Sequence, residues 1–335
     1  MEHFASFGWL PLIFAGLMGL AMLIYVILDG YDLGVGILMS LATEHEKDTM
    51  IASIGPFWDA NETWLVLGIG ILLVAFPQAH GIILTSLYIP VAIMLAGLIM
   101  RGVSFDFRAK AKSDHKHLWD KVFIIGSVVA SVAQGFMLAQ YILGFSYTFY
   151  SILFSLLAGL FLASGYGLMG ATWLIMKTQD NLQKKAVLWA RYALWFTALG
   201  MVMVSITTPL MSDRIFNKWF SIPEIFLLLP IPMITAALII AIDIILRKIP
   251  RPADTYCWVP FVGSAALFVL GFDGLAYSFY PYIVPDQLTI WQAASDTEAL
   301  EIILVGVAIV LPCIIGYTIF SYYIFRGKSK ELTYY

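Results

Sequence analysis

Acidic residues at the ends of the first three long apolar stretches are the side chains best suited to chemistry. Asp29 and Asp32 follow the first stretch, Asp59 and Glu62 open the second, and Asp106 follows the third. The two acids of each pair are three residues apart, so they share one face wherever the helix continues. A charged side chain at the centre of a membrane helix costs roughly 2.5 to 3.5 kcal/mol, so these acids require an explanation.

Two interpretations of these acids stay open from the residues alone. Carboxyl groups that are withdrawn from water can exchange protons near neutral pH, so a chain of them at one membrane face is suited to conduct protons. The simpler interpretation is that the acids cap helices and pair with Arg101 or Arg108. The residue types and spacing alone favour capping and pairing.

Composition places these acids in an integral membrane protein. The chain has 335 residues, of which 61% are hydrophobic and 12% are charged, whereas a soluble domain carries about 25% charged residues. A crossing of the roughly 30 Å hydrocarbon core needs about 20 apolar residues in a helix. The predicted spans are 9–28, 57–76, 81–100, a pair within 122–176 that turns at 144–148, 187–211, 225–246, 256–280 and 302–325.

The distribution of Lys and Arg predicts how these spans are oriented. Positively charged residues, Lys or Arg, gather in the loops after the third, fifth and seventh spans and in the tail after the ninth. The loop at 281–301 instead carries four acids and no Lys or Arg. Because loops rich in Lys and Arg stay in the cytoplasm, the N-terminus is predicted to be periplasmic and the C-terminus cytoplasmic. We therefore expect a multi-pass membrane protein.

The predicted fold class is an all-α integral membrane protein with nine transmembrane helices. Its order of spans and turns is compatible with two four-helix bundles plus one peripheral helix. The first bundle would comprise residues 1–140, the second residues 141–297, and the ninth helix with its cytoplasmic tail residues 298–335.

Other functional classes find little support in the sequence. None of the five histidines lies within a span beside a second one at ligand spacing, so haem ligation by this chain is not expected. Cys257 and Cys313 form no C-x-x-C motif, and no metal site is predicted. No basic run with interleaved aromatic residues exists, which argues against nucleic-acid binding. Gln134 and Asp273 are interpreted as isolated polar residues within spans.

Four motifs carry a resemblance to a known family. They are GYDLGVG at 30–36, PFWDANETW at 56–64, FDFR at 105–108, and FYPYIVP followed by LTIW within 279–291. In this order they resemble the signatures of subunit II of cytochrome bd-type quinol oxidases. Gln292 stands where the family often has Asp, and the loop between the sixth and seventh spans is short. Both departures fit the shorter, cyanide-insensitive branch of the family.

The resemblance implies membership of a translocase-class quinol:O2 oxidoreductase. Such a complex oxidises quinol, reduces O2 to water and generates a proton gradient. The resemblance implies haem b and haem d, or a third haem b, held mainly by a partner subunit I in a membrane-embedded heterodimer. Small single-helix accessory subunits and lipid are further expected partners. The alternative function is that of a proton-coupled secondary transporter, which would use acids near the membrane midplane in two related halves.

The resemblance also favours the proton-relay interpretation, in which this chain conducts cytoplasmic protons toward the di-haem site that it supports in subunit I. Asp59 is the first candidate for the relay, and Asp32 and Asp106 are supporting candidates. Weaker candidates are Asp29 and Glu62. Four neighbouring residues are expected to orient or pair with these acids: Trp58, Asn61, Arg101 and Arg108.

Overall fold

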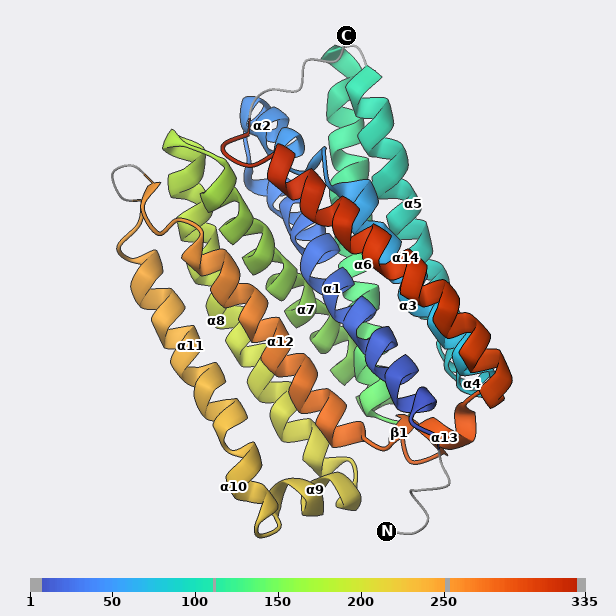
Figure 1. Ribbon diagram of the computed structural model, residues 1–335. Coiled ribbons are helices and arrows are strands. Elements are labelled where there is room, and N and C mark those ends of the chain that lie inside the picture. The colour runs from blue at the N-terminus through green and yellow to red at the C-terminus, as the bar shows by residue number, and fades with distance from the viewer. Residues whose placement is uncertain (1–7, 111–112, 251–253, 330–335) are drawn as a thin grey trace.

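The computed structural model describes residues 8–110, 113–250 and 254–329, and this part of the chain is almost entirely helical (Figure 1). Within these described ranges, eight helices are long and apolar enough to cross a membrane. They are α1 (Leu10–Leu38), α3 (Trp58–Ala75), α5 (Tyr88–Lys110), α6 (Ser113–Ile142), α7 (Phe149–Lys177), α8 (Asp180–Leu210), α12 (Val259–Phe279) and α14 (Thr297–Ile324).

Shorter elements connect these helices at both ends of the molecule. One end carries η1 (Met39–Leu41) and α2 (Glu44–Ile54). The other end carries α4 (Pro77–Ser86), α9 (Asp213–Phe220), α10 (Glu224–Leu228), α13 (Ile290–Ala293) and a hairpin of β1 (Tyr282–Val284) and β2 (Leu288–Thr289). The two strands are antiparallel, with Tyr282 opposite Thr289 and Val284 opposite Leu288. α1 begins and α14 ends at opposite ends of the molecule (Figure 1).

Eight of the predicted spans overlap described helices that can cross a membrane. Several ends differ, since α1 continues ten residues beyond position 28 and α8 begins seven residues before position 187. The third predicted span, 81–100, straddles a break at Leu87, and the apolar helix runs instead from Tyr88 to Arg108. The seventh predicted span coincides with α11 (Pro230–Leu246), a helix of 17 residues. At about 1.5 Å per residue α11 is near the lower limit for a crossing. The total of nine spans and their orientation therefore stay predictions.

α1 and α7 form the centre of the helix packing. α1 packs against α3, α6 and α7, while α7 packs against α6, α8 and α12. α5 packs on α6, and α11 packs on α12 and α8. α14 crosses the outside of this arrangement in front of α1 and α3 (Figure 1), and no residue of its most apolar window is buried. The bundle limits at 140 and 297 stay a proposal.

Glycine allows the backbones of α1 and α7 to touch. A Cβ atom on Gly34 would lie 1.8 Å from the carbonyl oxygen of Tyr166, and one on Gly170 would lie 2.4 Å from the carbonyl carbon of Gly34. Small residues permit such approach between membrane helices. The G-x-x-x-G spacing of Gly30 and Gly34 favours close approach of membrane helices, and the contact observed here holds the acid-bearing end of α1 inside the protein.

Replacing Gly34 with Ala should separate α1 from α7, because the added methyl group has no space. We expect the thermal midpoint of the purified protein in detergent to fall by an amount equivalent to about 3 kcal/mol, the upper part of the usual range for overpacking. Gly16→Ala on the same helix is the matched control, because a Cβ there meets nothing within 4 Å. Equal midpoints for the two variants would show that the α1–α7 contact is not tight.

Candidate functional site

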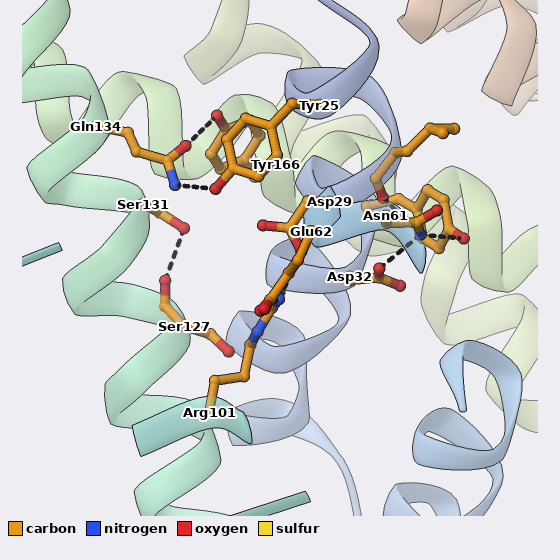
Figure 2. A network of polar contacts seen from close by, with 12 residues as sticks. Tyr25, Asp29, Asp32, Asn61, Glu62, Arg101, Ser127, Ser131, Gln134 and Tyr166 are labelled. Carbon is orange, nitrogen blue, oxygen red and sulfur yellow. Dashed lines mark hydrogen bonds and ion pairs between the residues drawn. The ribbon is translucent and has the colours of Figure 1, made fainter. Parts of the chain in front are cut away.

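Arg101 joins three helices through a buried ion-pair cluster. Its Nη2 atom lies 2.6 Å from Oδ1 of Asp29 and also contacts Oε1 of Glu62. Figure 2 shows Arg101 reaching from α5 toward Asp29 on α1 and Glu62 on α3. The side chains of Arg101 and Asp29 are 1% and 0% exposed, while that of Glu62 is 29% exposed. A buried cation needs such partners, because leaving water is costly for an unpaired charge.

Asp32 lies three residues after Asp29 on α1 and is held by an amide. Nδ2 of Asn61 donates to Oδ2 of Asp32 over 2.8 Å, and both residues are buried. The sequence predicts that Asn61 orients or pairs with one of the candidate acids, and in the structure that acid is Asp32. Asn61 points into the protein, whereas Asp59 is exposed in the first turn of α3. Residues two apart on a helix do not share a face.

Several buried polar atoms of this cluster keep hydrogen-bonding capacity. Within the described part of the chain, no bond satisfies Oδ2 of Asp29, Oδ1 of Asp32, or Nε and Nη1 of Arg101. Buried polar atoms in folded proteins usually find a protein or water partner. The carboxyl groups on α1 can therefore take up further hydrogen bonds in addition to those from Arg101 and Asn61.

A second polar chain continues from the cluster into the middle of the helices. Nε2 of Gln134 donates to the Tyr25 hydroxyl over 2.8 Å, and the Tyr166 hydroxyl donates to Oε1 of Gln134 over 2.6 Å. The interpretation of Gln134 as isolated is therefore wrong. Its partners are Tyr25 on α1, 109 residues away in the sequence, and Tyr166 on α7, 32 residues away. Residue spacing within one helix therefore could not indicate these contacts. Tyr25 lies one helical turn before Asp29, so the chain adjoins the acid cluster (Figure 2).

The other predicted site residues lie at or near the surface of the chain. Asp59 and Asp106 are exposed. Trp58 is half-buried and packs on Phe105 with ring centroids 4.9 Å apart. Asp273, on α12, is also exposed. The structure thus brings Asp29, Asp32, Asn61, Glu62 and Arg101 together and leaves Asp59 and Asp106 outside their buried cluster.

Arg108 pairs with acids that the sequence did not single out. Its Nη2 lies 2.8 Å from Oδ1 of Asp48 on α2, and its Nε donates to Oδ1 of Asp120 on α6 over 2.5 Å. The predicted pairing of Arg108 with the candidate relay acids is wrong. Arg108 lies seven residues beyond Arg101, which is about 10 Å along the helix axis. At that depth it meets α2 and the first turns of α6 instead of Asp29 and Glu62.

The described histidines offer no axial position for haem inside the helix packing. His45, His115 and His117 are exposed, and His80 is half-buried on α4 near the opposite end. His3 lies outside the described residues. No group of three His, Cys, Asp or Glu side chains within the described ranges is arranged to hold a metal ion.

Replacing Arg101 with Gln should destabilise the protein strongly, because Asp29 and Glu62 would lose their shared cation. Removing one partner of a buried ion pair costs about 3 to 5 kcal/mol. We expect a large drop in the amount of folded protein extracted from membranes and in its thermal midpoint. Lys110→Gln, at an exposed position of the same helix, should behave like the wild type. An unchanged midpoint for Arg101→Gln would mean that the ion pairs add no net stability.

Glu46 gives the α2 end of the molecule a defined pH dependence. Its carboxylate lies 2.8 Å from Nζ of Lys185 and joins α2 to α8. Burial acts to raise the pKa of Glu46, but bonds donated by Lys185 and Thr43 outweigh burial and lower this pKa from 4.5. A carboxyl group with a lowered folded-state pKa stabilises the protein above its unfolded pKa. That contribution is lost as pH falls through the folded pKa.

We therefore expect the wild type to have a higher thermal midpoint than Glu46→Gln at pH 7, by roughly 1 to 3 °C. This difference should shrink below about pH 4.5, where the carboxyl group of the unfolded chain begins to bind a proton before that of the folded protein does. Scanning fluorimetry between pH 7 and pH 3.5 measures both quantities. Glu301→Gln, at an exposed position on α14, is the control. A constant difference across the pH range would contradict the assignment.

Comparisons with known proteins agree over nearly the whole chain. The model of the family described as cytochrome bd terminal oxidase subunit II matches residues 10–325. Cytochrome bd ubiquinol oxidase subunit 2 of Bacillus subtilis is 27% identical over 331 residues, covering 92% of this chain and 93% of that protein. Cytochrome bd-I ubiquinol oxidase subunit 2 of Escherichia coli K12 is 25% identical over 371 residues, covering 94% of each.

A solved structure shares the fold. A chain of the bd oxidase from Geobacillus thermodenitrificans superimposes with a TM-score of 0.76 at 15% identity, covering 95% of this chain and 99% of that chain. At this identity the likeness concerns the arrangement of helices. The predicted family resemblance is confirmed by the family match and by these relatives.

Proposed function

Because this chain belongs to the cytochrome bd terminal oxidase subunit II family, we propose that it is one half of a quinol oxidase of the translocase class in a bacterial inner membrane. In this proposal a partner subunit I holds the haems, two of b type and a third of d or b type. The haems supply the electron transfer to O2. The positions of the described histidines support their placement in the partner.

The contribution proposed for this chain is to move cytoplasmic protons toward the partner and to support its di-haem site. The observation that supports the proposed proton relay is the cluster of acids around Arg101. Three acidic side chains, Asp29, Asp32 and Glu62, gather around one buried guanidinium. Ionisable groups are expensive within a membrane and usually serve a function there. A surplus of carboxyl groups over cations provides places where a proton can reside.

The exposure of the acids gives the relay a direction. Asp59 is exposed, Glu62 lies one turn further along α3 and is part-buried, and Asp29 is fully buried against Arg101. A proton would therefore be taken up at Asp59 and pass through Glu62 to the acids on α1. Asp106 is exposed on the neighbouring helix α5 and would act as an auxiliary collector.

The cytoplasmic origin of the protons is supported by the charged residues around the site. The α2 end of the molecule carries Lys47, Arg108, Lys116 and Lys185, each in an ion pair. Positive residues mark the cytoplasmic side of membrane proteins. The acid-bearing end of α1 leads directly into this region through η1 and α2.

A proton-coupled transporter is less well supported. Such a protein needs paired sites near the midplane at corresponding places of two halves. The acids here gather on α1 and α3 beside Arg101 on α5, whereas Asp273 on α12 is exposed away from them. A purely structural role for this chain is distinguishable by experiment, because replacing the acids would then lower the haem content and the turnover together.

Neutralising the relay acids should slow the oxidase without removing its haems. We expect Asp59→Asn and Asp32→Asn to lower quinol-oxidase turnover about tenfold, which corresponds to roughly 1.4 kcal/mol on the barrier. Membranes that co-express this chain with its subunit I are assayed for oxygen consumption and for the haem redox difference spectrum. Asp273→Asn serves as the control and should retain wild-type turnover.

Two results would contradict the proposal. Wild-type turnover and haem spectra in Asp59→Asn and Asp32→Asn membranes would exclude the relay. Loss of the haem spectrum in parallel with turnover would instead assign the acids to assembly.

A further inference from the structure

A closed ring of hydrogen bonds joins α1, α3 and α14 beside Asp32. Nδ2 of Asn61 lies 2.9 Å from the Tyr31 hydroxyl, the hydroxyls of Tyr31 and Tyr322 lie 2.6 Å apart, and the Tyr322 hydroxyl lies 3.3 Å from Oδ1 of Asn61. The side chains of Asn61 and Tyr31 are fully buried. Tyr322 is half-buried and belongs to α14, a helix whose buried residues are Leu300 and Ser321.

The direction of each bond in this ring follows from counting protons. An amide oxygen can only accept, so the Tyr322 hydroxyl donates to Oδ1 of Asn61. The Tyr31 hydroxyl accepts from Nδ2 of Asn61 and has one proton of its own, which it donates to Tyr322. Each hydroxyl in the ring therefore donates one bond and accepts one, while Nδ2 of Asn61 keeps a second N–H for acceptors outside the ring. Hydrogen bonds arranged in such a chain strengthen one another.

The contacts of the Asn61 amide outside the ring fix its orientation. With Oδ1 toward Tyr322, Nδ2 faces Oδ2 of Asp32 at 2.8 Å and the Leu28 carbonyl oxygen at 3.3 Å. The opposite orientation would place two acceptors, Oδ1 and the Leu28 oxygen, against each other. The contacts with Asp32 and Leu28 thus select this orientation, which directs an N–H group at the carboxyl group of Asp32, and the ring holds the amide in place.

Packing holds the two tyrosines in place. Tyr31 stacks on Trp173 with ring centroids 4.1 Å apart, and Tyr322 stacks on Phe57 at 4.5 Å. The chain just after Tyr322 is tied to the end of α7, because Nζ of Lys177 donates to the Phe325 carbonyl oxygen over 2.8 Å. Nζ of Lys328 also donates to the Thr178 carbonyl oxygen over 2.7 Å. The end of α14 is therefore anchored although most of that helix is exposed.

We propose that Tyr31 and Tyr322 are positioning residues that hold the Asn61 amide on Asp32, so that the last turn of α14 completes the proton site from outside the main helix packing. This inference rests on the proposed function, in which Asp32 exchanges protons. It assigns α14 a role in that exchange through a single hydroxyl group.

The test uses Tyr322→Phe and Tyr31→Phe in the intact oxidase complex, because each removes one hydroxyl and keeps the aromatic stacking. We expect turnover to fall about two- to tenfold, the range of one hydrogen bond between neutral groups. The double variant should lose no more than either single variant, because one broken bond already opens the ring. Tyr323→Phe is the matched control, because Tyr323 is adjacent in sequence and 62% exposed.

Infrared difference spectroscopy separates positioning from a general loss of structure. The band of the Asp32 carboxyl group is identified as the one missing in Asp32→Asn. We expect this band to shift in Tyr322→Phe and in Tyr31→Phe, with haem spectra unchanged, and to stay in place in Tyr323→Phe. A shift in either ring variant supports the proposal if the other variant fails to assemble.

The outcomes distinguish this inference from the relay. If Asp32→Asn lowers turnover but the ring variants keep the wild-type band and rate, the ring does not position Asp32, and the relay stands. If Asp32→Asn keeps full turnover, the relay through Asp32 is wrong, and the infrared band alone decides whether the ring holds the amide. Additive losses in the double variant would show that the two hydroxyls act separately.

Discussion

The buried guanidinium of Arg101 is the charge on which the arrangement of the first helices depends. It is 1% exposed and contacts carboxyl groups from two other helices. Asp29 and Arg101 could not remain inside the protein alone, because an unpaired buried charge costs several kcal/mol. The same pairing that makes their burial tolerable fixes the depth and rotation of α1, α3 and α5 relative to one another. The acid cluster is therefore both a structural joint and the candidate proton site.

Close helix packing decides which carboxyl groups become part of this joint. The contact of Gly34 with the backbone of α7 holds the end of α1 in the interior, so Asp29 and Asp32 are withdrawn from solvent although they lie near the end of an apolar segment. Asp59 begins α3 on the exposed side of the same region. The positions of the helices therefore place some acidic side chains at the surface and others in the interior, although all of them are carboxylic acids.

The outer helix α14 contributes through its last turn. Its apolar length is exposed in the chain, yet Tyr322 reaches Asn61 and Tyr31. Beyond Tyr322, the bond from Nζ of Lys177 to the Phe325 carbonyl oxygen anchors the end of α14 to α7. Polar contacts in a region of low dielectric constant are stronger and more costly to leave incomplete than those in water. A single hydroxyl group on a peripheral helix can therefore matter for a site built by three others.

The sequence by itself determined the membrane class, nearly every span and the family, because hydrophobic length, loop charge and motif order are local properties of the chain. It also indicated the acids of the site and the close approach at Gly34. Only the tertiary structure decided that Arg101 and not Arg108 pairs with Asp29, that Asn61 serves Asp32, and that Gln134 and Tyr322 have partners. These contacts join residues up to 291 positions apart in the sequence. They depend on the depth and rotation of the helices relative to one another, which the spacing of residues within one helix does not encode.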